Sequence, residues 1–245
     1  MNRSPDLKPG GAKTTKSSQP SKAGSSSRRI EPSSSVVFVV DDDISVRESL
    51  ELLIHRQGWQ PKTFPSAQEF LESPRVLVPN CLLLDISLPG LNGLDLQKRI
   101  AIERAEMPII FITGHGDVPK SVEAMKGGAA EFLTKPLNHE VLLSAIRQSL
   151  ERSRLALTRE AELQTLRDRY ASLTAREREV MAWIVSGLLN KQVGGQMDIA
   201  ESTVKAHRGQ VMQKMNAESL ADLVKMAAKL RIPEAPESSG PKSKS

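Results

Sequence analysis

The chain has 245 residues, a net charge of +5 and a single cysteine, Cys81. One cysteine excludes a disulfide-linked framework, no apolar run reaches the ~18 residues of a membrane span, and the four histidines lack zinc-site spacing. The first residues also lack the apolar core of a signal peptide. We therefore expect a soluble cytoplasmic protein with room for one large or two ordinary domains.

Both ends of the chain have a composition typical of disorder. Residues 1–34 are rich in Ser, Lys, Pro and Gly, with seven basic and two acidic residues. They cannot bury enough apolar surface to fold, so we expect a disordered basic extension there and a disordered tail over 233–245. Between the ends, residues 35–150 have an acidic excess of four, and residues 173–233 have a basic excess of three. This division suggests cation chemistry in the first module and a polyanionic partner for the second.

Residues 35–150 alternate between short β-rich runs and stretches with helical spacing. The runs are SVVFVV, WQPKTF, NCLLLDI, MPIIFIT and AEFLT. Apolar residues at helical spacing lie between them, as in Val46, Leu50 and Leu53. Five strands separated by helices predict an α/β fold with a parallel sheet covered on both faces.

Polar residues follow four of these strands at the point where each strand ends. In chain order they are Asp41, Asp42, Asp85, Thr113 and Lys135. Ligands of such folds bind at the carboxyl ends of the strands, so one crevice can collect all five side chains. Close carboxylates raise one another's pKa unless a cation compensates, and Mg²⁺ suits oxygen ligands that leave room for water and phosphate. The alternative is that each acidic residue only caps a helix, which accounts for one Asp more readily than for the whole set.

Four segments of this module, VVDDD, LLLDISLPGLNGLDL, IIFITGHGD and EFLTKP, resemble the receiver domain of bacterial response regulators, in the same order. The resemblance implies a flavodoxin-like, five-stranded parallel sheet. It implies that Asp85 is the phosphoacceptor. It also implies a Mg²⁺ site made by Asp42, Asp85 and the backbone carbonyl of Ser87, with Asp41 assisting through water.

The same resemblance implies roles for residues at the other strand ends. Thr113 and Lys135 would contact the phosphoryl group, Phe132 would be an aromatic switch residue, and the Lys135–Pro136 peptide would be cis. His115 would either tune the phosphoryl lifetime or be a plain loop histidine. These roles fit phosphoryl transfer to a carboxylate, which depends mainly on positioning and charge neutralisation. The acyl phosphate adds charge and acceptor oxygens that can draw Thr113 inward and reshape the neighbouring loop.

A phosphatase with an aspartyl nucleophile is a competing interpretation of Asp85. Such an enzyme needs a second Asp two residues later as its acid/base, and Ser87 stands there. The sequence also shows no Cys–His pair and no nucleophilic serine elbow. The residues therefore disfavour an enzyme.

Residues 151–172 are expected to form a linker helix, because they are strongly charged and lack Gly and Pro. Their apolar residues at 3-4-3 spacing cover about two heptads, fewer than the three to four that indicate a coiled coil. Docking on the chain's own domains and dimerisation are both open for this helix. The residues at that spacing are Leu163, Leu166, Tyr170 and Leu173.

Residues 173–232 have the pattern of an all-α, four-helix domain. Thr174 and Glu177 have capping-box spacing at the start of the first helix, which ends at Gly187. Asn190 is expected to cap a short second helix, KQVGGQM. A third helix, ESTVKAHRGQVMQKM, and a fourth, LADLVKMAAKL, follow.

The helical wheel of the third helix separates an apolar face from a polar one. The inward face carries Val204, Val211 and Met215. A face of small and amide side chains edged with cations can enter the major groove of DNA. A generic helical domain with a solvated face accounts for the wheel equally well. The outward residues are Ala206, Gly209, Gln210 and Gln213, with Lys205 and Lys214 at the flanks.

The segment LTAREREVMAWIVSGLLNKQVGGQMDIAESTVKAHRGQVMQKM resembles the LuxR/FixJ-type helix-turn-helix. The resemblance implies that the third helix is the recognition helix, with Lys205 and Gln210 as DNA contacts. Thr203, His207 and Arg208 would contact phosphate or pack. Lys191 would lie at the start of the second, scaffold helix, where backbone N–H groups favour phosphate.

The sequence departs from this family pattern at two places. Gly194-Gly195 stands where the family has bulkier helix formers, and Gly209 stands at an outward position that is often basic. Two glycines inside a short helix indicate either close approach of a neighbouring helix or deliberate softness, since interior Gly costs about 1 kcal/mol relative to Ala. We expect an Ala substitution to stabilise at least one of the two positions.

Together these features predict a two-component response regulator. A sensor histidine kinase would phosphorylate Asp85 in the receiver, residues 35–150. The receiver would then dimerise, or release the domain at 173–232, to bind promoter DNA. RNA polymerase is a further expected partner, and a membrane is not. The competing hypothesis is a DNA-binding regulator whose receiver is a phosphorylation-independent interaction scaffold; the complete set of acidic, Thr and Lys residues weighs against it.

Overall fold

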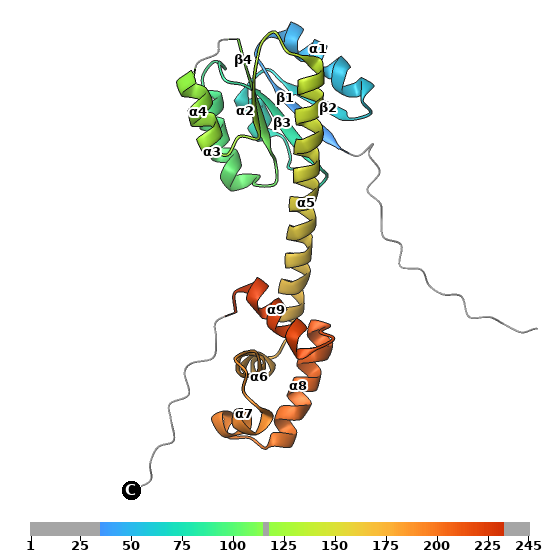
Figure 1. Ribbon diagram of the computed structural model, residues 1–245, viewed down its shortest axis with the longest axis vertical. Coiled ribbons are helices and arrows are strands. Elements are labelled where there is room, and N and C mark those ends of the chain that lie inside the picture. The colour runs from blue at the N-terminus through green and yellow to red at the C-terminus, as the bar shows by residue number, and fades with distance from the viewer. Residues whose placement is uncertain (1–34, 115–117, 233–245) are drawn as a thin grey trace, which may run out of the picture. The chain divides into compact units, whose positions relative to one another are not determined.

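The computed structural model describes residues 35–114 and 118–232 (Figure 1). The expected disordered ends and His115 lie outside the described residues. The first module contains β1 (Val36–Val40), α1 (Ile44–Arg56), β2 (Gln60–Phe64), α2 (Ala67–Glu72), β3 (Asn80–Asp85), α3 (Gly93–Glu103), β4 (Ile109–Thr113), α4 (Val118–Lys126), β5 (Glu131–Thr134) and the long helix α5 (His139–Ala171). The second module contains α6 (Ala175–Val185), α7 (Asn190–Met197), α8 (Glu201–Met215) and α9 (Leu220–Leu230).

The five strands form one parallel sheet in the order β2-β1-β3-β4-β5. Both sides of the sheet are covered because the strand side chains alternate between two apolar clusters. Phe38 and Leu84 belong to the cluster under α2, α3 and α4, whereas Val39 and Leu83 belong to the cluster under α1 and α5. The sequence prediction of a flavodoxin-like, five-stranded parallel sheet is confirmed.

Strand order decides where the chain can hold a ligand. β1 and β3 are neighbours, with Val40 opposite Leu84, and the connections leaving their carboxyl ends run to opposite faces of the sheet. The resulting switch point is where such sheets bind ligands. Asp41 and Asp85 both stand at this edge. The Lys135–Pro136 peptide that follows β5 is cis, as the resemblance implied.

Helix α5 is a single helix of 33 residues. Its first turns pack Leu142, Ile146 and Leu150 against the receiver sheet. Near its other end Leu166 is buried against the second module, where α5 contacts α8 and α9. The linker residues thus dock on the second module, which is one of the two arrangements expected for them. Within the described residues, no helix combines the length and apolar character needed to cross a bilayer.

The four helices of the second module enclose one apolar cluster that includes Val180, Val204 and Leu223. The Thr174–Glu177 capping box is present as predicted, and Ser219 caps α9. The prediction for Asn190 is wrong: this residue is the first of α7, not its cap.

The start of α7 explains why Asn190 does not act as the cap. The N–H of Leu189 donates to Oε1 of Gln192 at 2.8 Å, so a glutamine supplies the capping interaction. The side chain of Asn190 instead accepts a hydrogen bond from Nη1 of Arg208 on α8, at 3.2 Å. A contact between two helices has replaced a local one.

The two glycines of α7 have different surroundings. A Cβ atom on Gly194 would lie 2.8 Å from the backbone carbonyl oxygen of Ile199, whereas a Cβ on Gly195 would meet nothing within 4 Å. Gly194 also accepts the N–H of Ile199 at 3.0 Å. Close approach of the Ile199 backbone thus explains Gly194. Gly195 has no such neighbour, so it is the glycine that lowers helix stability without a packing reason.

We predict that Gly195→Ala stabilises the second module by about 1 kcal/mol and that Gly194→Ala destabilises it. Open space lets Ala gain its helix propensity at 195, while at 194 the backbone itself must shift. The measurement is thermal unfolding followed by Trp183 fluorescence in a Trp59→Phe background, because the chain has only these two tryptophans. For a domain of this size the midpoint should move by roughly 4–8 °C per kcal/mol. A rise at position 194 would contradict the close-approach explanation.

Candidate functional site

Three carboxylates converge at the switch point of the sheet. Oxygens of Asp41, Asp42 and Asp85 all lie within 4.8 Å of one another. Asp41 and Asp85 are buried, at 1% and 7% exposure, and Asp42 is exposed. Such a set of hard oxygen ligands, open on one side, has the chemistry of a divalent-cation site.

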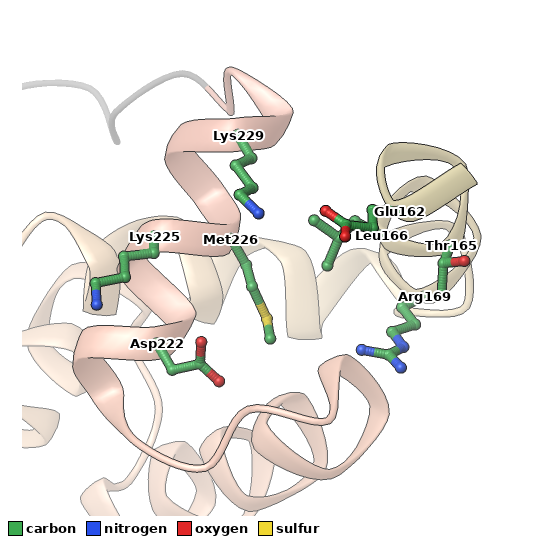
Figure 2. A pocket seen from close by; sticks show the side chains of 8 residues that line it. All are labelled: Glu162, Thr165, Leu166, Arg169, Asp222, Lys225, Met226 and Lys229. Carbon is green, nitrogen blue, oxygen red and sulfur yellow. The ribbon is translucent and has the colours of Figure 1, made fainter. Parts of the chain in front are cut away.

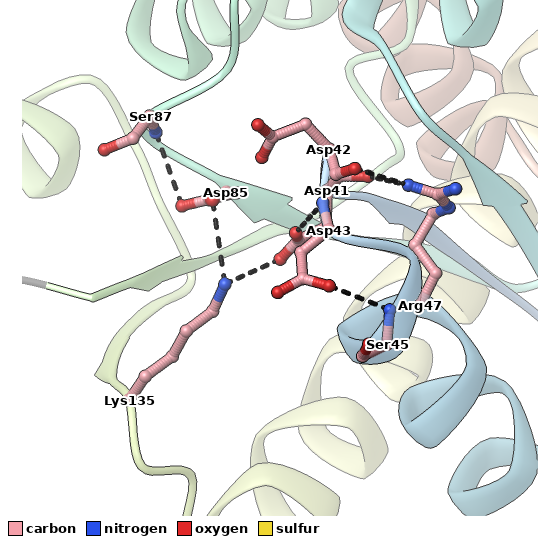
Figure 3. A network of polar contacts seen from close by, with 8 residues as sticks. All are labelled: Asp41, Asp42, Asp43, Ser45, Arg47, Asp85, Ser87 and Lys135. Carbon is pink, nitrogen blue, oxygen red and sulfur yellow. Dashed lines mark hydrogen bonds and ion pairs between the residues drawn. The ribbon is translucent and has the colours of Figure 1, made fainter.

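One ammonium group reaches this acidic crevice from the end of β5 (Figure 3). Nζ of Lys135 lies 2.8 Å from Oδ2 of Asp41 and 3.6 Å from Oδ2 of Asp85. Burial by itself would lower the pKa of Lys135, but the hydrogen bond and charge of Asp41, with a contribution from Asp85, raise it above its ordinary value. Lys135 is therefore firmly cationic. The N–H of Lys135 also donates to the carbonyl of Thr113 at 2.7 Å, which ties the end of β5 to the end of β4.

The single ammonium does not balance the charge at Asp85. Burial raises the pKa of Asp85, and the charges of Asp41 and Asp42 add to this effect. Lys135 and the N–H of Ser87, which donates to Oδ1 of Asp85 at 3.3 Å, lower the pKa without reversing the shift. Counting only the described residues, the crevice is therefore short of positive charge, and a divalent cation fits the residues present.

The third aspartate of the DDD run takes no part in the crevice. Asp43 is the N-cap of α1, where its Oδ1 accepts the N–H of Ser45 at 2.8 Å. Its own N–H donates to Oδ1 of Asp41 at 2.9 Å. The helix-cap interpretation thus holds for this one Asp.

The structure brings most of the other predicted receiver residues to the same edge. Thr113 is buried at the end of β4, and the backbone of Ser87 touches Asp85. Phe132 is partly buried, with its ring 6.5 Å from that of Phe111. Sequence reasoning missed Arg47, which donates hydrogen bonds to the backbone of the acidic loop. A basic residue on the helix that follows an acidic loop was the available signal.

The outward face of α8 is as predicted, with one correction. Lys205 and Gln210 are exposed, while Val204 and Val211 are fully buried. The expectation that Lys214 edges this face is wrong, because its ammonium lies 2.7 Å from Oε2 of the buried Glu177 at the start of α6.

The salt bridge of Glu177 has an electrostatic consequence inside the second module. The hydrogen bond from Lys214, together with the N–H of Thr174, lowers the pKa of Glu177. The carboxylate therefore stays ionised, and it holds the end of the capping box to α8. The orientation of α8 depends on this pair as well as on apolar packing.

The remaining predicted DNA residues divide into two groups. Lys191 and Thr203 are exposed, as Lys205 and Gln210 are. His207 and Arg208 are half-buried, and Arg208 is bonded to Asn190, which favours packing for this residue.

A separate groove of about 350 Å³ lies between α5 and α9 (Figure 2). Leu166 and Met226 are its apolar lining, and five charged side chains surround them. Two lysines of α9, Lys225 and Lys229, line this groove and not the exposed face of α8. They are therefore useful charge controls for the α8 surface.

Both modules of the chain match known protein families. A model of the response regulator receiver domain matches residues 37–147, and a model described as bacterial regulatory proteins, luxR family, matches residues 171–227. The chain is 47% identical over 197 residues to nodulation protein W of Bradyrhizobium diazoefficiens, covering 80% of this chain and 87% of that protein. The chain belongs to the response regulators with a receiver domain and a LuxR-type helix-turn-helix domain.

Other relatives agree with this assignment. The transcriptional regulatory protein FixJ of the same organism is 40% identical over 191 residues, covering 78% of this chain and 93% of that protein. The low-resolution structure of the response regulator StyR superposes with a TM-score of 0.72 and 44% identity, covering 80% of this chain and 99% of that one. The response regulator described here is thus a DNA-binding transcription regulator of a two-component system, in a family of regulators that are not enzymes. Its receiver implies a sensor kinase as partner.

The response regulator should become more stable when Asp85 is replaced by Asn in the absence of metal. The pKa of Asp85 is raised in the folded state, so the stability that protonation confers at low pH is lost as pH rises through the folded pKa. An amide removes the unfavourable charge and leaves Lys135 paired with Asp41. The measurement is thermal unfolding at pH 7 in chelator, followed by Trp59 fluorescence in a Trp183→Phe background.

The control for this experiment is Glu48→Gln, which removes one exposed carboxylate from α1. It should leave the midpoint nearly unchanged. Added Mg²⁺ should raise the midpoint of the Asp85 protein more than that of Asp85→Asn, because only ligand-binding native states gain stability. A lower metal-free midpoint for Asp85→Asn would mean that attraction to Lys135 outweighs burial.

Proposed function

We propose that this response regulator accepts a phosphoryl group on Asp85 from a sensor histidine kinase and then binds promoter DNA through α8. The observation that carries the proposal is the acidic crevice with one half-buried lysine, Lys135. Asp85 ends a central strand, and Lys135 Nζ lies 3.6 Å from its carboxylate. Phosphoryl transfer to a carboxylate needs in-line positioning and neutralisation of charge, which this arrangement supports.

Asp42, Asp85 and the carbonyl of Ser87 would hold Mg²⁺, with Asp41 assisting through water. When bound, the ion neutralises charge on the transferring phosphoryl oxygens. Asp85 supplies the attacking oxygen, and Lys135 pairs with a phosphoryl oxygen while it remains bonded to Asp41. The bound ion would thus balance the excess of negative charge around Asp85.

Thr113 and Phe132 would couple phosphorylation of Asp85 to structural change outside the crevice. The acyl phosphate adds oxygens that can accept a hydrogen bond from the Thr113 hydroxyl, and a shift of the end of β4 would change the space around Phe132. The contact between the Lys135 N–H and the Thr113 carbonyl supports this coupling, because it joins the two strand ends directly.

Pairing of two phosphorylated receivers would involve α4. This helix follows the strand that ends in Thr113 and exposes an apolar row formed by Val118, Val122 and Met125. These residues are one turn apart, so they share a face. A second copy of the chain is the occupant that we propose.

The DNA-binding residues proposed here are Lys205 and Gln210 as base or phosphate contacts, with Lys191 and Thr203 as phosphate contacts. Their exposure on α7 and α8 supports this assignment. We propose domain limits of 35–150 for the receiver, 151–172 for the linker and 173–232 for the DNA-binding domain. The continuity of α5 across residue 150 makes the linker an extension of the last receiver helix.

The decisive test of the receiver is labelling by radioactive acetyl phosphate. Asp85→Asn should abolish labelling, and removal of Mg²⁺ by chelator should do the same. Asp43→Asn is the matched control: Asn also caps helices well, so α1 and most of the labelling should be retained. Equal labelling of the wild type and Asp85→Asn would leave only the scaffold hypothesis for this receiver.

Lys205→Ala should weaken binding to an operator selected by the purified protein from a random duplex pool. If Lys205 contacts phosphate, the log–log salt slope should fall by about 0.9. If it contacts a base, discrimination should fall by roughly 1–3 kcal/mol with less change in slope. Fluorescence anisotropy at several salt concentrations measures both.

The control for the DNA experiment is Lys225→Ala, which removes the same charge from the groove between α5 and α9. It should bind the operator with nearly the affinity of the wild type. Unchanged affinity of Lys205→Ala would show that this part of α8 does not lie in the groove of DNA.

A further inference from the structure

Arg47 holds the loop that carries two of the three acidic residues (Figure 3). Its Nη1 donates to the backbone carbonyl of Asp41 at 2.7 Å and to that of Asp42 at 3.0 Å. Hydrogen bonds with an ionised donor are shorter and stronger than neutral ones. One nitrogen of α1 thus restrains two consecutive peptide groups of the β1–α1 loop.

The guanidinium of Arg47 contacts main-chain oxygens. Among the residues that the structure describes, no carboxylate pairs with Arg47, although three carboxylates lie nearby. Its position on α1 is set by the helix, where the N–H of Arg47 donates to the carbonyl of Asp43 at 3.1 Å. The side chain therefore contacts main-chain oxygens in preference to available acidic groups.

The restraint matters most for Asp42. Its carboxylate is exposed and, within the described part of the chain, accepts no hydrogen bond and pairs with no cation. Asp41, in contrast, is fixed by Lys135 and by the N–H of Asp43. Only the backbone of Asp42 limits where its oxygens can lie, and Arg47 is the side chain that holds this backbone.

We propose that Arg47 is a positioning residue for the cation site: it fixes the peptide groups of Asp41 and Asp42 so that the Asp42 carboxylate faces Asp85. The inference rests on the Mg²⁺ site of the proposed function. Groups behind metal ligands act by orienting them, and their loss weakens metal binding by about 10- to 100-fold. Arg47 never touches the ion in this role.

A role through charge and a role through position predict opposite changes in Mg²⁺ affinity when Arg47 is replaced. If only charge mattered, removing a cation beside a Mg²⁺ site would tighten Mg²⁺ binding. If Arg47 positions the loop, Arg47→Gln should raise the Mg²⁺ dissociation constant by about tenfold. Arg47→Lys retains the charge without the rigid guanidinium, so positioning predicts weaker binding and charge alone predicts no change.

The measurement is isothermal titration of Mg²⁺ into the full chain, with the Mg²⁺-dependent rise in the unfolding midpoint as a second readout. The control is Arg56→Gln, which removes the same charge from the exposed end of α1, about 13 Å further along the helix axis and beyond the Debye length of about 8 Å at physiological salt. This control should bind Mg²⁺ as the wild type does. The unfolding midpoint of each variant without metal shows whether that variant is folded. If Arg47→Gln does not fold, Arg47→Lys tests the positioning role.

Weaker binding by Arg47→Gln or Arg47→Lys, with Arg56→Gln unchanged, supports the positioning role. Equal or tighter binding by the folded Arg47 variants overturns it while leaving the Mg²⁺ site intact. Failure of the wild type to bind Mg²⁺ would overturn both the site and this role. Labelling by acetyl phosphate should recover in the Arg47 variants when Mg²⁺ is raised, whereas Asp85→Asn should stay unlabelled at any concentration.

Discussion

Repulsion among three carboxylates at the edge of one parallel sheet is the constraint on which the receiver depends. The topology places Asp41 and Asp85 on adjacent strands, and burial prevents water from screening them fully. Lys135 offsets part of the charge and stays bonded to Asp41 at 2.8 Å. The imbalance that remains at Asp85 favours the binding of a cation, and it costs stability when no cation is bound.

The second module relies on a similar interaction for a different purpose. Glu177 is buried at the start of α6 and bonded to Lys214 of α8. In both modules a buried carboxylate and a half-buried lysine join segments far apart in the chain. Removing one partner of such a pair would leave an uncompensated charge, which is far more destabilising than the pair is stabilising. In the receiver the pair lies in the acidic crevice, and in the helical module it joins α8 to the start of α6.

Local pattern was sufficient for most of the fold. The alternation of short β-rich runs with helical spacing predicted the five strands. The signal is clearest for β1, β3 and β4, because parallel strands buried on both faces are largely apolar. The Thr174–Glu177 box and the limits of α8 were also correct, since caps and helix periodicity involve residues within one turn. The prediction for Asn190 was wrong for the opposite reason: its side chain accepts a hydrogen bond from Arg208, eighteen positions later in the chain.

The sequence by itself determined which residues gather in the crevice, because strand ends of a parallel sheet meet at one edge. Asp41, Asp42 and Asp85 needed no further information. Only the tertiary structure decided which groups hold them. Arg47 bonds to backbone oxygens, and Gly194 differs from Gly195 through one carbonyl of another segment. Such contacts depend on distances between segments that no local periodicity specifies. Gly194 and Gly195 therefore look alike in the sequence, and only the folded chain distinguishes them.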